Sequence, residues 1–273
     1  MGFSLKIKDV KKIIEFINEI YNFDLSDFTY VSIKIKMEQF IDKYKITSVD
    51  DLFNKVKKIS SLRNEFIKFL LVDSFELFRD PALWRIVKEE VLHNFSRDIM
   101  YKVWIPSCFQ GAELLSFLIL REELGMADKI QVFYSSPFKV LSDVKGGFNY
   151  EERKHGLSLS NYKRIDGHNL DEKYFTKVQN VMIPLNSLFN NTIQYEYNEI
   201  EQPFSKAVNM ILYRNILLRY NKKKQADVAQ NLIKSLKSRG FLILGVKESL
   251  VDDANRELFT IFNLKESIYK KKN

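Results

Sequence analysis

Apolar residues in the first third of the chain recur at steps of three and four, the spacing that places side chains on one face of an α-helix. The clearest such set is Val10, Ile13, Ile14, Ile17 and Ile20. Similar spacing predicts five helices between residue 8 and about residue 95. We expect the third to begin at Ser48 or Asp50, whose side chains can cap a helix, and the fifth at Pro81. These helices indicate an all-helical N-terminal domain over residues 1–95.

The pattern changes near Tyr101, where short apolar runs begin to alternate with helical segments. The predicted strands are Lys102–Ser107, Lys129–Ser135, Thr192–Asn198, Ala207–Tyr213 and Gly240–Val246, and the predicted helices are Ala112–Leu124 and about Lys222–Lys237. Such alternation predicts an α/β fold with a mostly parallel sheet and helices on both faces. The second domain is therefore expected over residues 96–273, with an insertion of its own small structure at about 142–191.

Composition supports a folded protein without a membrane span. Hydrophobic residues make up 45% of the chain and charged residues 29%, which is typical of a globular protein. The longest apolar runs are far too short to cross a bilayer, and the N-terminus lacks the apolar core of a secretory signal. Cys108 is the only cysteine, so an internal disulfide is excluded. A cytoplasmic location is consistent with these features.

The formal net charge of +8 would suit nucleic acid, an anionic membrane or an acidic protein partner. The lysines are dispersed, with the densest groups at residues 222–224 and 270–272. We interpret these groups as solvated helix ends and a frayed tail. Because no zinc-finger or RNA-recognition motif is present, no nucleic-acid partner is expected.

The loop after the first predicted strand carries the first candidate ligand-binding residues. In open α/β sheets, ligands lie outside the carboxyl ends of the strands. Gly111 would allow the backbone to come close to a ligand, and the carboxylate of Glu113 could accept hydrogen bonds from a cationic or amino-bearing ligand. The three histidines, His93, His155 and His168, show no metal or triad spacing, so no metal site is predicted.

Three longer segments together resemble the chemotaxis-receptor (CheR-type) methyltransferase family. They are LVDSFELFRDPALW at residues 71–84, YKVWIPSCFQGAE at 101–113, and VNMILYRNILLRYNKKKQADVAQNLIKSLKSRGFLILGVKESL at 208–250. They occur in the family's order, and the third is long and specific. The chain is therefore identified as a divergent member. The resemblance implies a small helical domain followed by a Rossmann-like methyltransferase domain that binds S-adenosylmethionine (SAM).

The resemblance also implies an activity and a set of site residues. The activity is transfer of a methyl group from SAM to glutamate side chains in the cytoplasmic part of a chemoreceptor or another acidic protein, with S-adenosylhomocysteine (SAH) as product. Arg79 and Arg214 correspond to arginines that place a carboxylate in a desolvated, electropositive pocket. The cofactor-binding positions that the resemblance implies are Arg79, Gly111, Glu113, Ser135, Ser136, Asn198 and Asn215.

Several positions depart from the family pattern. Phe109-Gln110 replaces a Ser-Thr pair, and Ala112 replaces one of two acids. The second strand ends in Ser135-Ser136, where the family has an acid that holds the ribose hydroxyls. A lost charge-assisted hydrogen bond costs about 1.5–3 kcal/mol. Asp143 or Glu199 could supply the missing carboxylate.

These departures leave two alternatives to a receptor methyltransferase. One is a degenerate relative that keeps the fold and acts as a binding or signalling module. The other is a small-molecule methyltransferase that reuses the same fold, because fold alone does not set chemistry.

Overall fold

The structure, a computed structural model, describes residues 4–71, 75–96, 99–109, 111–136, 144–196, 201–250 and 253–273. The chain forms two compact units, Met1–Asp73 with Leu218–Gln225, and Ser74–Leu217 with Ala226–Asn273. The boundary expected near residue 95 thus lies inside the second unit. The reason is that α5 (Pro81–Ile86) and η1 (Val87–Leu92), a turn of π-helix, bury their apolar side chains in the core of that unit.

The first unit is helical, as the three- and four-residue spacing predicted. Its helices are α1 (Ile7–Tyr21), α2 (Tyr30–Lys43), α3 (Val49–Lys58) and α4 (Ser60–Leu71). Ser48 caps α3, since its hydroxyl accepts a hydrogen bond from the backbone N–H of Asp51 at 3.1 Å. Residues 218–225 join this unit through an isolated bridge between Phe28 and Tyr220.

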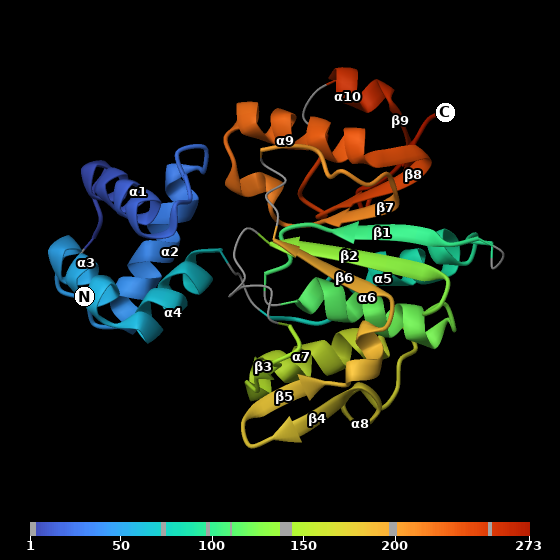
Figure 1. Cartoon of the computed structure of the whole chain (residues 1–273), viewed down its shortest axis with the longest axis horizontal. Coiled ribbons are helices and arrows are strands. Elements are labelled where there is room, and N and C mark those ends of the chain that lie inside the picture. Colours follow the sequence, from blue (N-terminus) through green and yellow to red (C-terminus); the bar gives the residue numbers. More distant parts are fainter. Residues whose placement is uncertain are drawn as a thin grey trace. The chain divides into compact units, whose positions relative to one another are not determined.

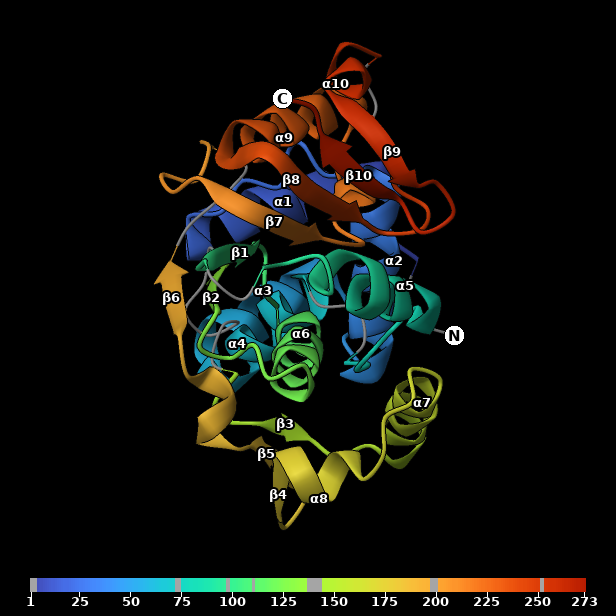
Figure 2. The same ribbon diagram turned by 90° about the vertical axis from the view of Figure 1, so that its right-hand side faces the viewer.

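The second unit is built on a seven-stranded sheet of order β6-β2-β1-β7-β8-β10-β9 (Figures 1 and 2). The strands are β1 (Tyr101–Ile105), β2 (Ile130–Ser136), β6 (Thr192–Glu196), β7 (Val208–Tyr213), β8 (Leu236–Leu244), β9 (Phe259–Asn263) and β10 (Ile268–Lys271). The pairs from β6 to β8 are parallel, and β10 is antiparallel to both of its neighbours. The strand order reverses between β1 and β7, which is where an open parallel sheet binds its ligand.

Helices cover both faces of this sheet, which confirms the predicted α/β class. Figures 1 and 2 show α6 (Ala112–Glu123) and α5 on one face and α9 (Lys222–Ser235) on the other. The remaining short helices are η4 (Leu217–Arg219) and α10 (Asp253–Glu257). Arg121 of α6 is fully buried, and its guanidinium donates to the backbone oxygens of Ile130, Leu188 and Asn190. Burial lowers the pKa of Arg121 to about 10, so this arginine remains charged at neutral pH.

The segment between β2 and β6 has a small structure of its own. It contains β3 (Phe148–Asn149), α7 (Glu152–Lys163), α8 (Leu170–Tyr174), β4 (Phe175–Val178), β5 (Val181–Pro184) and η3 (Asn186–Phe189). The three strands form an antiparallel sheet of order β3-β5-β4. Tyr162 of α7 donates to Glu123 at the end of α6, and Asn161 donates to Glu76 at 2.8 Å. The insertion is therefore anchored to the body of its unit.

The C-terminal lysines are not a frayed tail, contrary to the sequence prediction. Residues 268–271 form β10, which lies between β8 and β9 within the sheet. The Lys271 ammonium donates to the backbone oxygens of Ile233 and Leu236, at 2.8 and 2.7 Å. These carbonyls belong to the end of α9 and the start of β8, so the lysine caps a helix terminus. Among the described residues, no helix has both the length and the apolar character that a bilayer crossing requires.

Candidate active site

Arg214, directly after β7, forms a buried cluster with two carboxylates. One terminal nitrogen, Nη1, donates to Glu113 Oε1 at 2.7 Å, and the other, Nη2, donates to Asp80 Oδ2 at 2.6 Å. The same Nη2 also donates to the backbone oxygen of Arg79 at 3.2 Å. The arginine side chain is 0% exposed, whereas those of Asp80 and Glu113 are 35% and 27% exposed. Three segments far apart in the sequence therefore meet at one guanidinium.

This cluster is more acidic than the sequence suggested. Burial alone would lower the pKa of Arg214, but the negative charges of Glu113, Asp80 and Glu248 raise it above its ordinary value. The sequence led us to expect an electropositive pocket, with Arg214 free to place a ligand carboxylate. The guanidinium is instead already paired with two carboxylates of the protein. The predicted catalytic role of Arg214 stays a prediction.

The segment that carries Arg79 and Asp80 is held in an unusual backbone conformation. Phe78 and Asp80 have φ angles of 53° and 59°, which are rare for residues with a side chain. Phe78 is fully buried, and its backbone N–H donates to the Ser116 hydroxyl of α6 at 2.8 Å. Trp84 donates from Nε1 to the Arg79 backbone oxygen at 3.0 Å. Such conformations persist only where the surroundings fix them, and they are concentrated at functional sites.

The backbone of Arg79 belongs to this cluster, but its guanidinium binds neither Asp80 nor Glu76, the two acids nearest to it in the sequence. Asp80 binds Arg214, and Glu76 accepts a hydrogen bond from Asn161. Arg79 is half-buried, and its side chain has no ion pair with any residue that the structure describes. Its positive charge is therefore available to a ligand.

Gly111 directly precedes α6, as its N-cap residue, and packs tightly against Val144. Its φ is +80°, and a Cβ built on it would lie 2.3 Å from Val144 Cγ1. The glycine is therefore needed both for its backbone conformation and for close packing against the insertion. Phe109, two residues before it, is half-buried, and its N–H donates to the Ser107 backbone oxygen at 2.8 Å. Cys108 is buried in the same loop, and burial raises the pKa of its thiol to about 12.

Replacing Gly111 by alanine should destabilise the protein by about 2–4 kcal/mol, which combines left-handed strain with overpacking against Val144. Gly125→Ala is the matched control, because Gly125 has a φ of +63° but no atom within 4 Å of the place that an added Cβ would occupy. Urea unfolding measures both variants. Adding Val144→Ala to Gly111→Ala should recover the overpacking part. Equal losses for the two glycine variants would show that Val144 does not press on this site.

The two serines at the end of β2 are buried within the protein. Ser135 and Ser136 are both fully buried. The Ser135 hydroxyl accepts a hydrogen bond from Trp104 Nε1 at 3.1 Å, and its backbone oxygen accepts one from the Cys108 N–H at 2.7 Å. Asn198, and the acids Asp143 and Glu199, lie outside the described residues. The cofactor roles predicted for Ser135, Ser136 and Asn198 stay predictions.

Asn215 follows Arg214 and is fixed by Glu248, a residue that the sequence analysis did not select. Glu248 Oε2 accepts hydrogen bonds from the backbone N–H groups of Asn215 and Gly245, at 2.8 and 2.7 Å. Asp80 was also missed as a site residue. Both residues lie in segments that resemble the CheR family. Asp80 follows Arg79 in the segment at residues 71–84, and Glu248 belongs to a Gly-x-x-Glu near the end of the segment at 208–250.

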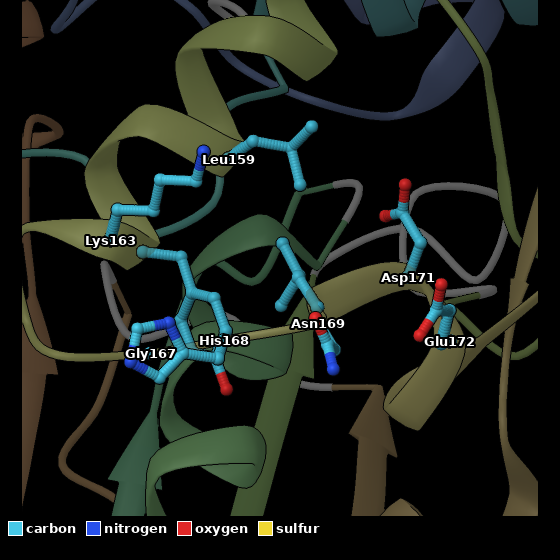
Figure 3. Close-up of a pocket in the computed structure, with 9 residues that line it drawn as sticks. Leu159, Lys163, Gly167, His168, Asn169, Asp171 and Glu172 are labelled. Atoms are coloured by element: carbon cyan, nitrogen blue, oxygen red, sulfur yellow. The ribbon is translucent and has the colours of Figure 1, made fainter.

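A separate cavity of about 240 Å³ lies in the insertion, between α7 and α8 (Figure 3). Its lining residues are Leu159, Tyr162, Lys163, Gly167, His168, Asn169, Leu170, Asp171 and Glu172. None of them belongs to the Arg214 cluster or to the loops after β1, β7 and β8. In the part of the chain that the structure describes, no group of three or more His, Cys, Asp or Glu side chains is placed to hold a metal ion.

Comparison with known sequences decides the family. The profile described as "CheR methyltransferase, SAM binding domain" matches residues 74–268. The chain belongs to the CheR methyltransferase family. The family resemblance inferred from the three segments is thereby confirmed, and SAM is the cofactor of this domain.

Individual CheR-family relatives are distant in sequence. A protein of Pseudomonas putida named as a methyltransferase, Cher3, is 24% identical over 96% of this chain and 96% of its own length. A chemotaxis protein methyltransferase of Listeria innocua is 21% identical and covers 88% of this chain and 89% of its own. Among solved structures, the N-methyltransferase NodS of Bradyrhizobium japonicum, in complex with SAH, matches with a TM-score of 0.38 at 9% identity, over 74% of this chain and 95% of its own. A structural match with so low a TM-score says nothing about function.

The residues present fit the methionine part of SAM better than its adenosine part. The Nε–H of Arg214 is buried and has no acceptor among the described residues, so a ligand that brings an oxygen there would satisfy it. Asp80 and Glu113 each bind Arg214 through one carboxylate oxygen. Because both side chains are partly exposed, the second carboxylate oxygen of each is accessible to a cationic ligand. At the adenosine end, β2 finishes with Ser135 and Ser136 rather than with a carboxylate.

Proposed function

We propose that this CheR-family protein transfers the methyl group of SAM to a carboxylate side chain of an acidic protein, of the receptor-glutamate type. The observation that carries the proposal is the Arg79 guanidinium, which has no ion-pair partner in the described structure although its backbone is fixed beside the Arg214 cluster. An acceptor carboxylate needs a cation whose charge is not already neutralised. Within this cluster, Arg79 meets that requirement and Arg214 does not.

The remaining residues would bind and orient the cofactor. Asp80 and Glu113, anchored at one oxygen each, would receive the positive charges of the methionine part. When bound, SAM supplies an electrophilic methyl group on a positively charged sulfur. A carboxylate is ionised at neutral pH, so no general base is required. Arg79 would act by holding the acceptor in line and by excluding water.

The proposed acceptor is the cytoplasmic part of a chemoreceptor. Several relatives are named as chemotaxis protein methyltransferases, which supports a partner of this kind. The net charge of +8 also favours an acidic surface. A receptor acceptor would place the protein in the cytoplasm.

Replacing Arg79 by alanine tests the proposal. Methyl transfer from radiolabelled SAM to a receptor cytoplasmic fragment should fall about tenfold to a hundredfold, the equivalent of one lost charge-assisted hydrogen bond. The label should be released as methanol by mild base, because the product is an ester. Arg153→Ala, an exposed position on α7, is the matched control. An unchanged rate in Arg79→Ala, or label that survives base, would contradict the proposal.

A second candidate is a signalling module that keeps the fold without turnover. The packing of Val144 on Gly111 and the two serines in place of an acid at the end of β2 favour it. In that case the wild-type protein would transfer no methyl group to any acidic fragment. Calorimetric titration with SAM and SAH would then show whether cofactor binding persists without catalysis.

A further inference from the structure

Glu248 links the loops that follow two neighbouring strands. It lies in the turn after β8, where its backbone N–H donates to the Gly245 oxygen at 2.8 Å. This turn brings its side chain back over the strand ends, so that Oε2 accepts from the N–H groups of both Gly245 and Asn215. Because β7 and β8 are paired in parallel up to Tyr213 and Leu244, one carboxylate oxygen joins both loops.

The position of this carboxylate is closely fixed. Glu248 is only 3% exposed, and its backbone oxygen accepts a hydrogen bond from the Ser267 hydroxyl at 3.1 Å. A Cβ at position 245 would lie 2.7 Å from Glu248 Oε2 and 2.9 Å from the Asn215 nitrogen. Only glycine at 245 therefore lets the carboxylate reach both amides. Hydrogen bonds from N–H groups to a carboxylate are roughly twice as strong as those to a neutral acceptor.

The contact with Asn215 carries the effect of Glu248 to the active-site cluster. Asn215 has a φ of 61°, a conformation that needs support from its surroundings. Because Asn215 directly follows Arg214, its conformation determines how the arginine enters the cluster with Asp80 and Glu113. Glu248 also contributes to the negative charge around Arg214.

We propose that Glu248 is a positioning residue of the cofactor site, which fixes the Asn215 backbone and thereby holds the Arg214 cluster in the geometry that receives the methionine part of SAM. The inference rests on the proposed function for the identity of the ligand, and it is independent of the acceptor. A glutamate that only stabilised its own turn would change folding stability but leave the affinity for SAM unaltered in the folded protein.

Two substitutions in the full chain separate these roles. Glu248→Gln keeps an amide oxygen for both N–H groups but removes the charge. Its melting temperature should stay near that of the wild type, while the Kd for SAM in calorimetric titration rises about fivefold, the equivalent of about 1 kcal/mol. Glu248→Ala removes both hydrogen bonds, and the Kd should rise by about thirtyfold or more. Exchange of the Asn215 amide hydrogen should also accelerate in Glu248→Ala.

Glu152→Gln, at an exposed position on α7, is the control and should bind SAM like the wild type. A wild-type Kd in Glu248→Gln and in folded Glu248→Ala would overturn the inference. Should Glu248→Ala fail to fold, Glu248→Gln alone decides. Absence of SAM binding by the wild type would also overturn it. Normal binding without transfer to a receptor fragment would count against the proposed acceptor and leave the role of Glu248 intact.

Discussion

Replacing Arg214 by methionine should lower the free energy of unfolding by about 3 kcal/mol and raise the Kd for SAM by at least a hundredfold. The substitution keeps an unbranched, though shorter, side chain but leaves Asp80 and Glu113 without their shared cation. Removing one partner of a buried ion pair typically costs about 3–5 kcal/mol. We expect the lower end of that range because both carboxylates are partly exposed and can regain water. Urea unfolding and calorimetric titration measure the two effects.

The exposed Arg153→Met is the control for loss of an arginine. Neutralising the partners as well, in a triple variant with Asp80→Asn and Glu113→Gln, should restore most of the stability, because neutral groups are less costly to leave unpaired. The triple variant should still fail to bind SAM. Restored stability together with restored binding would show that the charges of this cluster are not what the cofactor requires.

Trp84→Ala should cost about 3–5 kcal/mol, the range for truncating a large buried aromatic side chain. Trp84 is 0% exposed, and its ring packs edge-on against Phe78 at a centroid distance of 5.7 Å. It also lies 5.9 Å from the Arg214 guanidinium carbon. Its loss would therefore remove the support of both the core and the Arg79 backbone, and SAM affinity should fall together with stability.

Trp84→Phe separates the two contributions. It keeps most of the ring volume but loses the Nε1–H that donates to the Arg79 oxygen. The expected cost is about 1–2 kcal/mol. Thermal and urea unfolding measure both variants. A Trp84→Ala protein with nearly wild-type stability would mean that the region around α5 is not part of the core of its unit.

Much of the fold could be predicted from periodicity. The helices of the first unit and the strands β1, β2, β7 and β8 lie within a few residues of their predicted positions, because burial on one face leaves a regular trace in the sequence. The last strands were missed. Phe259–Asn263 and Ile268–Lys271 are short, and the second ends in lysines, which hid its burial.

The site was predicted only in part, since its key contacts depend on long-range pairing. The resemblance pointed to Arg79, Glu113 and Arg214, and the structure brings all three segments together. The resemblance did not indicate that Asp80 and Glu113 both bind Arg214, because local sequence does not determine which carboxylate pairs with which cation. The role of Glu248 likewise depends on the register of β7 and β8.

The position of β10 has a consequence for the order of folding. In the described structure β9 joins the sheet through β10, so β10, which follows β9 in the chain, is an interior strand, and β8 has an unpaired edge until β10 is present. During synthesis, the sheet therefore cannot be completed until residues 268–271 have emerged from the ribosome. Lys271, which closes the end of α9, belongs to the same strand and is synthesised with it.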